Sequence, residues 1–107
     1  MHPALHAYHE VLAPAWHADE GAPRVAASCE ASPQLIERAG PLGAAMTAQQ
    51  TEAGADAPSA ASEALTAAAA GLAERCAAEP RDDQAVEAAI AEVHDRFHTI
   101  MEALQGE

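Results

Sequence analysis

The sequence contains no lysine and has only one Phe, one Trp and one Tyr. Five basic residues stand against seventeen acidic ones, so the formal net charge is −12 at pH 7. We do not expect so acidic a chain to bind a nucleic-acid backbone or an anionic lipid surface, because both attract positive charge. Cations and basic proteins remain as partners, and the lack of lysine beside abundant alanine and arginine is typical of a GC-rich bacterial genome.

Residues that build sheets are also scarce. Few β-branched or aromatic side chains are present, whereas alanine, leucine and glutamate are abundant and favour helix. No apolar run reaches the roughly 20 residues that a membrane-spanning helix needs, and the N-terminus lacks the basic and apolar regions of a signal peptide. A length of 107 residues suits one domain. We therefore expect a single all-α domain, residues 1–107, without a membrane span.

Apolar spacing and capping residues predict four helices, at about residues 3–18, 32–50, 59–79 and 82–105. Pro14 should kink the first helix, and Gly40-Pro41 should interrupt the second near residues 40–41. The segment 19–27, with a glycine and a proline, has the composition of a loop. Short connections between the four helices then predict an antiparallel up-down-up-down four-helix bundle.

In this topology the two cysteines, Cys29 and Cys76, fall at the same end of the bundle. A disulfide requires its Cα atoms to lie within about 7 Å, so we predict a Cys29–Cys76 bridge. Such a bridge would place the protein in an oxidising compartment, as a periplasmic or secreted domain. The alternative is a cytoplasmic protein in which both thiols stay reduced.

A pattern near the start of the chain recurs near its end. His2 to Glu10 and His94 to Glu102 both follow His-x-x-(Leu or Phe)-His-x-x-(His or Met)-Glu. Residues four apart lie on one face of a helix, so each segment presents two imidazoles and a carboxylate as a column. His9 and Met101 occupy equivalent places in the repeat.

Antiparallel packing of the first and last helices would bring His6 level with His98, and the two columns could then hold a transition metal. We predict binding through His6, His94 and His98, with His2 or His9 as the fourth ligand. The full set of candidate ligands is His2, His6, His9, Glu10, His94, His98, Met101 and Glu102. Copper and zinc rank ahead of nickel and iron, and the Met101 thioether would favour Cu(I). The expected role is metal storage, transport or sensing.

Two other functions stay open. In size and architecture the chain resembles the cytochrome b562 and cytochrome c′ group, exported four-helix bundles that hold haem with a histidine near the end of the last helix. His94 or His98 matches that location, and the resemblance implies noncovalent haem, because no Cys-x-x-Cys-His sequence is present. The third reading is a structural or partner-binding bundle whose histidines are solvated.

Enzymatic chemistry is not favoured, because the chain has no nucleophile elbow, glycine-rich phosphate loop or His-Glu-x-x-His sequence. His17 stands apart from the repeat, and we interpret it as a helix C-terminal residue that the helix dipole favours. Pairing of two protomers is a further open alternative.

Overall fold

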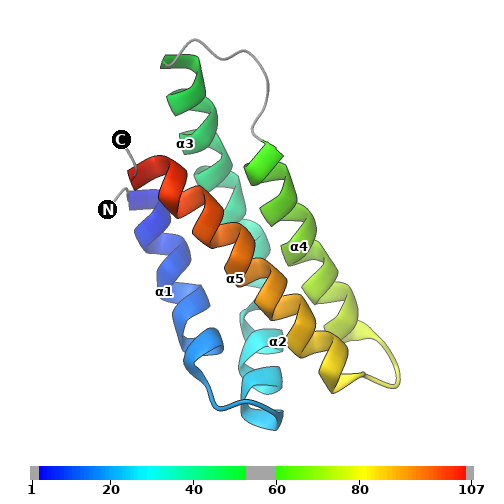
Figure 1. The fold of residues 1–107 in the computed structure, drawn as a ribbon. Coiled ribbons are helices and arrows are strands. Elements are labelled where there is room, and N and C mark those ends of the chain that lie inside the picture. Colours follow the sequence, from blue (N-terminus) through cyan, green and yellow to red (C-terminus); the bar gives the residue numbers. More distant parts are fainter. Residues whose placement is uncertain (1–2, 53–59, 106–107) are drawn as a thin grey trace.

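The computed structural model describes residues 3–52 and 60–105, and this part of the chain forms five helices and no strands (Figure 1). The helices are α1 (Pro3–His17), α2 (Ala22–Glu37), α3 (Ala39–Glu52), α4 (Ala60–Ala77) and α5 (Asp83–Gln105). The all-α class is confirmed. The prediction of four helices is wrong, because the second predicted helix is in fact two, and the first of these begins at residue 22 instead of 32.

Chain direction alternates along the molecule. α2 and α3 run one after the other in the direction opposite to α1, α4 runs back, and α5 returns beside α1 (Figure 1). The first turn of α1 and the last turn of α5 therefore lie near each other (Figure 1). Among the described helices, none is long and apolar enough to cross a membrane.

The start of α2 lies inside the segment that we expected to be a loop. Gly21 has a φ of 94°, a left-handed conformation that glycine adopts without strain, and it turns the chain sharply after α1. Pro23 then occupies the first turn of α2, where its missing N–H is not needed. The residues that suggested a loop are thus the residues that start a helix.

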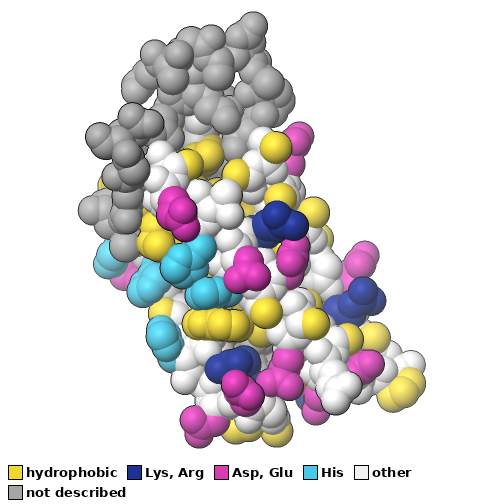
Figure 2. Space-filling view, viewed as in Figure 1, with side chains coloured by type: hydrophobic (Ala, Val, Ile, Leu, Met, Phe, Trp, Pro, Cys, Tyr) yellow, Lys and Arg dark blue, Asp and Glu magenta, His cyan; other side chains and the backbone are white. Residues whose placement is uncertain are grey.

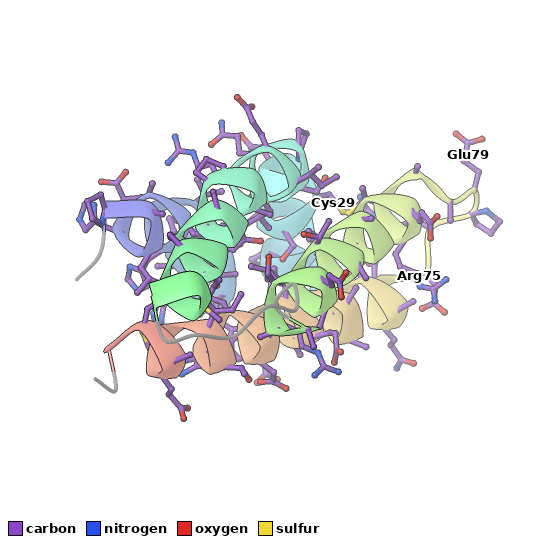
Figure 3. All side chains as sticks on the ribbon, turned by 90° about the horizontal axis from the view of Figure 1, so that it is seen from above. Cys29, Arg75 and Glu79 are labelled. Atoms are coloured by element: carbon purple, nitrogen blue, oxygen red, sulfur yellow. A yellow bond between two sulfur atoms is a disulfide. The ribbon has the colours of Figure 1, made fainter. Side chains whose placement is uncertain are left out.

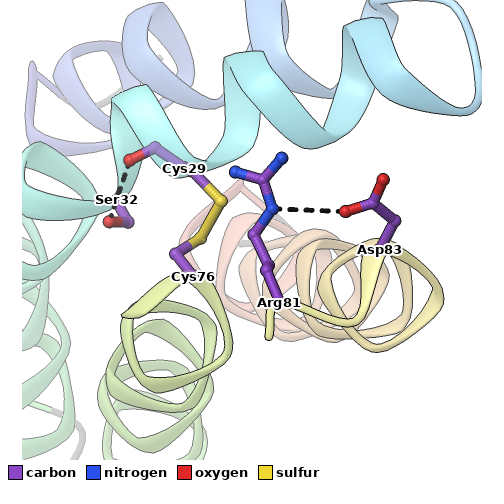
Figure 4. Close-up of a disulfide and its surroundings, with 5 residues drawn as sticks. All are labelled: Cys29, Ser32, Cys76, Arg81 and Asp83. Carbon is purple, nitrogen blue, oxygen red and sulfur yellow. Dashed lines mark hydrogen bonds and ion pairs between the residues drawn. A yellow bond between two sulfur atoms is a disulfide. The ribbon is translucent and has the colours of Figure 1, made fainter. Parts of the chain in front are cut away.

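Pro33, which we expected to begin a helix, lies inside α2. A proline in a helix interior leaves the carbonyl four residues earlier without its usual donor. That carbonyl belongs to Cys29, and it accepts a hydrogen bond from the Ser32 hydroxyl at 3.2 Å (Figure 4). This local hydrogen bond satisfies the carbonyl that Pro33 leaves without a backbone donor.

The break between α2 and α3 falls at Arg38, slightly before the predicted interruption at 40–41. Gly40 and Pro41 instead lie in the first turn of α3. The Arg38 guanidinium donates a hydrogen bond of 2.8 Å from Nη1 to the carbonyl oxygen of Ala7. This contact ties the break to α1.

The last two helices follow the prediction closely. α4 ends at Ala77, before Pro80, and α5 begins after Asp82. The Asp82 carboxylate caps α5 by accepting hydrogen bonds from the backbone N–H groups of Gln84, at 3.0 Å, and Ala85, at 3.2 Å. This is the arrangement that an N-terminal aspartate provides.

All five helices contribute to one core. Its largest fully buried side chains are Leu5, Tyr8, Val25, Leu35, Leu42, Leu65, Leu72, Val86, Ile90, Val93, Phe97 and Ile100. The Tyr8 and Phe97 rings stack at a centroid distance of 5.4 Å and join α1 to α5. These two rings are the only aromatic side chains among the buried core residues that the structure describes.

The predicted disulfide is present. Cys29 of α2 and Cys76 of α4 are bridged with their Cα atoms 5.5 Å apart (Figure 4). The two residues are separated by 47 positions in the sequence, and both side chains are half-buried against the core. The bridge therefore holds the middle of α2 against the end of α4. Figure 3 labels Cys29 of α2 and Arg75 near the end of α4.

Candidate metal centre

A cavity of about 230 Å³ lies between α1 and α5. Its walls carry four imidazoles, an indole, a phenyl ring and a thioether. The lining residues are His9, Leu12, Ala13, Trp16, His17, His94, Phe97, His98 and Met101. On this face of the molecule the histidine side chains gather next to hydrophobic ones (Figure 2).

Helical periodicity explains which residues line the cavity. On α1, His9, Ala13 and His17 are spaced four apart and share one face. On α5, His94 and His98 have the same spacing, with Phe97 and Met101 beside them. The buried Tyr8–Phe97 stack fixes how these two faces meet.

The two imidazoles of α5 lie next to each other. The His94 and His98 ring centroids are 4.5 Å apart, with an angle of 55° between the ring planes. His94 also stacks on Trp16 at 4.2 Å, with an interplanar angle of 16°. Its side chain is 23 % exposed, and its Nδ1 lies 3.4 Å from an Asp95 carboxylate oxygen. Two imidazoles are thus adjacent, and one of them is oriented by neighbours on both helices.

Tyr8 lies behind this wall of the cavity, fully buried against Phe97. Its hydroxyl makes no hydrogen bond to any described residue. Burial raises the pKa of the Tyr8 phenol, because the anion would lose its solvation. The phenol therefore stays neutral and contributes packing to the site.

Part of the predicted ligand set lies elsewhere. His6 does not line the cavity; its Nδ1 faces Glu10 at 3.4 Å, and its side chain is 64 % exposed. Glu10 is also 3.7 Å from the Arg38 guanidinium. Both residues are thus engaged on the side of α1 that faces the α2–α3 break, away from the two imidazoles of α5.

Of the other predicted ligands, His9 and Met101 line the cavity with His94 and His98. Glu102 is exposed and does not line it, and His2 lies outside the described residues. Within residues 3–52 and 60–105, no three His, Cys, Asp or Glu side chains come together in a ready metal site. The cavity brings donors near one another without arranging them around a single point.

The sequence analysis missed His17, which lines the same cavity as His94 and His98. The signal was its spacing from His9, because positions 9, 13 and 17 form one column on α1. The predicted role of His17 was limited to the helix terminus. Trp16 and Phe97, which also line the cavity, were not among the predicted site residues.

Comparison with known proteins does not assign a function to this cavity. No protein-family model matches the chain, and neither a curated protein nor a solved structure shows significant similarity to it.

Proposed function

We propose that the protein binds a copper ion in the cavity between α1 and α5 and serves as a carrier or store of that metal. One observation carries the proposal: four imidazoles and a thioether from two helices converge on one cavity, and two of the imidazoles have ring centroids 4.5 Å apart. Neutral imidazole and thioether are ligands for copper, and imidazole also suits zinc.

In the proposed site His94 and His98 form the chelating pair, because histidines four apart on a helix can bind one ion together. His9 or His17 of α1 supplies a third imidazole. His9, His17 and His98 are exposed, so they can change rotamer when an ion binds, a common adjustment on binding. The His94 ring, held against Trp16, stays in place.

Copper is preferred to zinc because of Met101. A thioether is a soft ligand that selects Cu(I), whereas zinc favours thiolate, imidazole and carboxylate. The carboxylates predicted as ligands, Glu10 and Glu102, do not line the cavity. The donors that do line it therefore match copper better than a harder ion.

The size of the cavity favours an ion over haem. Sites for drug-sized ligands usually have volumes of about 300–1,000 Å³, and the space between α1 and α5 is about 230 Å³. A porphyrin would need the two helices to separate and the Tyr8–Phe97 stack to open. An ion with its ligands requires only side-chain movement.

We also propose that this helical bundle works outside the cytoplasm, in a periplasm or as a secreted protein. The Cys29–Cys76 bridge supports this location, because disulfides persist in oxidising compartments. A bundle that carries copper there would encounter both oxidation states of the metal.

Copper titration monitored by tryptophan fluorescence tests the proposal. Trp16 is the only tryptophan in the sequence, and its ring lies 4.2 Å from His94, so copper bound in the cavity should quench its emission. We expect saturable quenching at a fixed molar ratio, with copper retained through desalting, and a weaker response to zinc. Unchanged fluorescence together with no retained copper would refute the proposed function.

A further inference from the structure

The imidazole pair of α5 is the end of a longer stack of planar groups. The Arg24 guanidinium carbon lies over the Trp16 ring at 4.7 Å from its centroid. Trp16 in turn stacks on His94 at 4.2 Å, and His94 adjoins His98 at 4.5 Å. Trp16 therefore contacts both the guanidinium of Arg24 and the imidazole of His94.

Arg24 is itself held in place by the turn between α1 and α2. Its Nε donates a hydrogen bond of 3.2 Å to the Ala18 carbonyl, and its backbone N–H donates one of 3.0 Å to the Asp19 carbonyl. The neighbouring Gly21 N–H donates to a Glu87 carboxylate oxygen at 2.9 Å, which attaches the turn to α5. The guanidinium is thus anchored from its own turn and, through Glu87, from the helix that carries His94.

The contact with Trp16 also bears on the orientation of the His94 ring. The His94 ring plane lies within 16° of the indole plane, and the indole is contacted in turn by Arg24. Its Nδ1 faces the Asp95 carboxylate at 3.4 Å, which favours the tautomer with the proton on Nδ1. Nε2 is then the nitrogen with a free lone pair, the arrangement found when a carboxylate supports a metal-binding histidine.

We propose that Arg24 is a positioning residue of the metal site: it confines Trp16, and through Trp16 it holds His94 in the orientation that binds copper. This role rests on the proposed function, since it assigns a purpose to the stack at the same cavity. Arg24 does not line the cavity, so it acts through the indole and not as a ligand. Arginine suits this role because its flat guanidinium stacks on aromatic faces.

The test compares Arg24→Gln with Arg75→Gln in the full chain. Arg75 is exposed on α4 and does not line the cavity, so its substitution removes the same charge without touching the stack. Two quantities are measured for each variant: the chemical shifts of the His94 ring protons without metal, and the affinity for copper. The His94 signals are assigned by their loss in His94→Gln.

In the wild-type chain the His94 ring protons should be shifted upfield by the indole ring current. We expect Arg24→Gln to lose most of that shift and to weaken copper binding by about tenfold or more, the usual effect of removing a group that orients a ligand. Arg75→Gln should change neither quantity. Unchanged His94 shifts in Arg24→Gln, or lost shifts with unchanged copper affinity, would overturn the positioning role.

The two proposals can fail separately. Failure of the wild-type chain to take up copper overturns the proposed function, and with it the purpose of the stack. Normal copper uptake by the wild type and by Arg24→Gln alike overturns the positioning role alone.

Discussion

Two hollows flank α1, and the larger one has no imidazole or thioether among its lining residues. The hollow between α1 and α2 measures about 490 Å³, against about 230 Å³ for the histidine cavity between α1 and α5. Alanine, valine and proline side chains make most of its floor, with Glu10, Glu30, Gln34 and Arg38 around them. Volume alone would select the hollow on the other side of the helix from the proposed site.

The difference lies in how the polar groups are partnered. In the larger hollow, Arg38 donates to the Ala7 carbonyl and lies 3.7 Å from Glu10, which also faces His6. Arg38 and Glu10 there form an ion pair of opposite charges. In the smaller cavity the polar groups are imidazoles and a thioether, none of which neutralises the others. The proposed site therefore rests on the imidazole and thioether donors that line the smaller cavity and not on the amount of space.

The largest expected effect concerns the bridge that joins α4 to α2, the helix that lines the larger hollow. Replacing Cys29 and Cys76 together with serine should lower the free energy of unfolding by about 4 kcal/mol, the loop-entropy value for a closed loop of this length. Urea denaturation of the two proteins under non-reducing conditions measures the change. A loss of well under about 1 kcal/mol would show that the helices hold α2 against α4 without the bridge.

Filling each hollow in turn tests which of them matters for metal. Ala13 lines the histidine cavity and Ala31 lines the larger hollow. Two variants, Ala13→Leu and Ala31→Leu, each fill one of these spaces. We expect Ala13→Leu to weaken copper binding by at least about tenfold, equivalent to about 1.4 kcal/mol, because the added side chain occupies the space of the ion. Ala31→Leu is the matched control and should leave copper affinity unchanged.

If Ala31→Leu weakened copper binding as much as Ala13→Leu, the distinction between the two hollows would not hold. Melting temperatures of both variants, measured without metal, show whether either substitution disturbs the fold.

The smallest expected effect is at Tyr8, which packs behind the histidine cavity. Its hydroxyl makes no hydrogen bond to a described residue, so at pH 7 Tyr8→Phe should leave the free energy of unfolding within about 1 kcal/mol of wild type, or raise it. Denaturant titrations of both proteins at neutral pH measure this difference.

At high pH the free energies of unfolding of the wild type and of Tyr8→Phe should diverge. Burial raises the pKa of Tyr8 in the folded state, whereas a tyrosine in the unfolded chain ionises near pH 10. The unfolded state therefore loses its proton first, and the wild type should lose stability as the pH rises above about 10. Tyr8→Phe should remove that part of the loss; identical pH profiles would argue against a neutral, buried phenol.

Much of the fold was predictable from local patterns. The limits of α4 and α5 follow from Asp82 as a cap, from Pro80 and from apolar spacing along the last helix. The start of α2 was not, because a glycine and a proline two residues apart are equally typical of a loop and of a helix start. The structure decides between them, because α2 begins at Ala22, directly after the positive φ of Gly21.

The site was predictable in part for a similar reason. Spacing assigns His94 and His98 to one face of α5, but it does not say which face of α1 meets them. His6 and His9 were both candidates, and the choice depends on the buried Tyr8–Phe97 stack, which joins α1 to α5 with His9 and not His6 lining the cavity. The stack of Arg24 on Trp16 joins residues from two helices across a turn, so no periodic pattern could indicate it.

The most direct test of the histidine cavity compares His98→Ala with His6→Ala in a copper titration monitored by Trp16 fluorescence. Both variants remove one exposed imidazole, but only His98 lines the cavity. The proposed site predicts that His98→Ala loses at least about tenfold in copper affinity while His6→Ala binds as the wild type does. Equal affinities in the two variants, or a larger loss in His6→Ala, would contradict it.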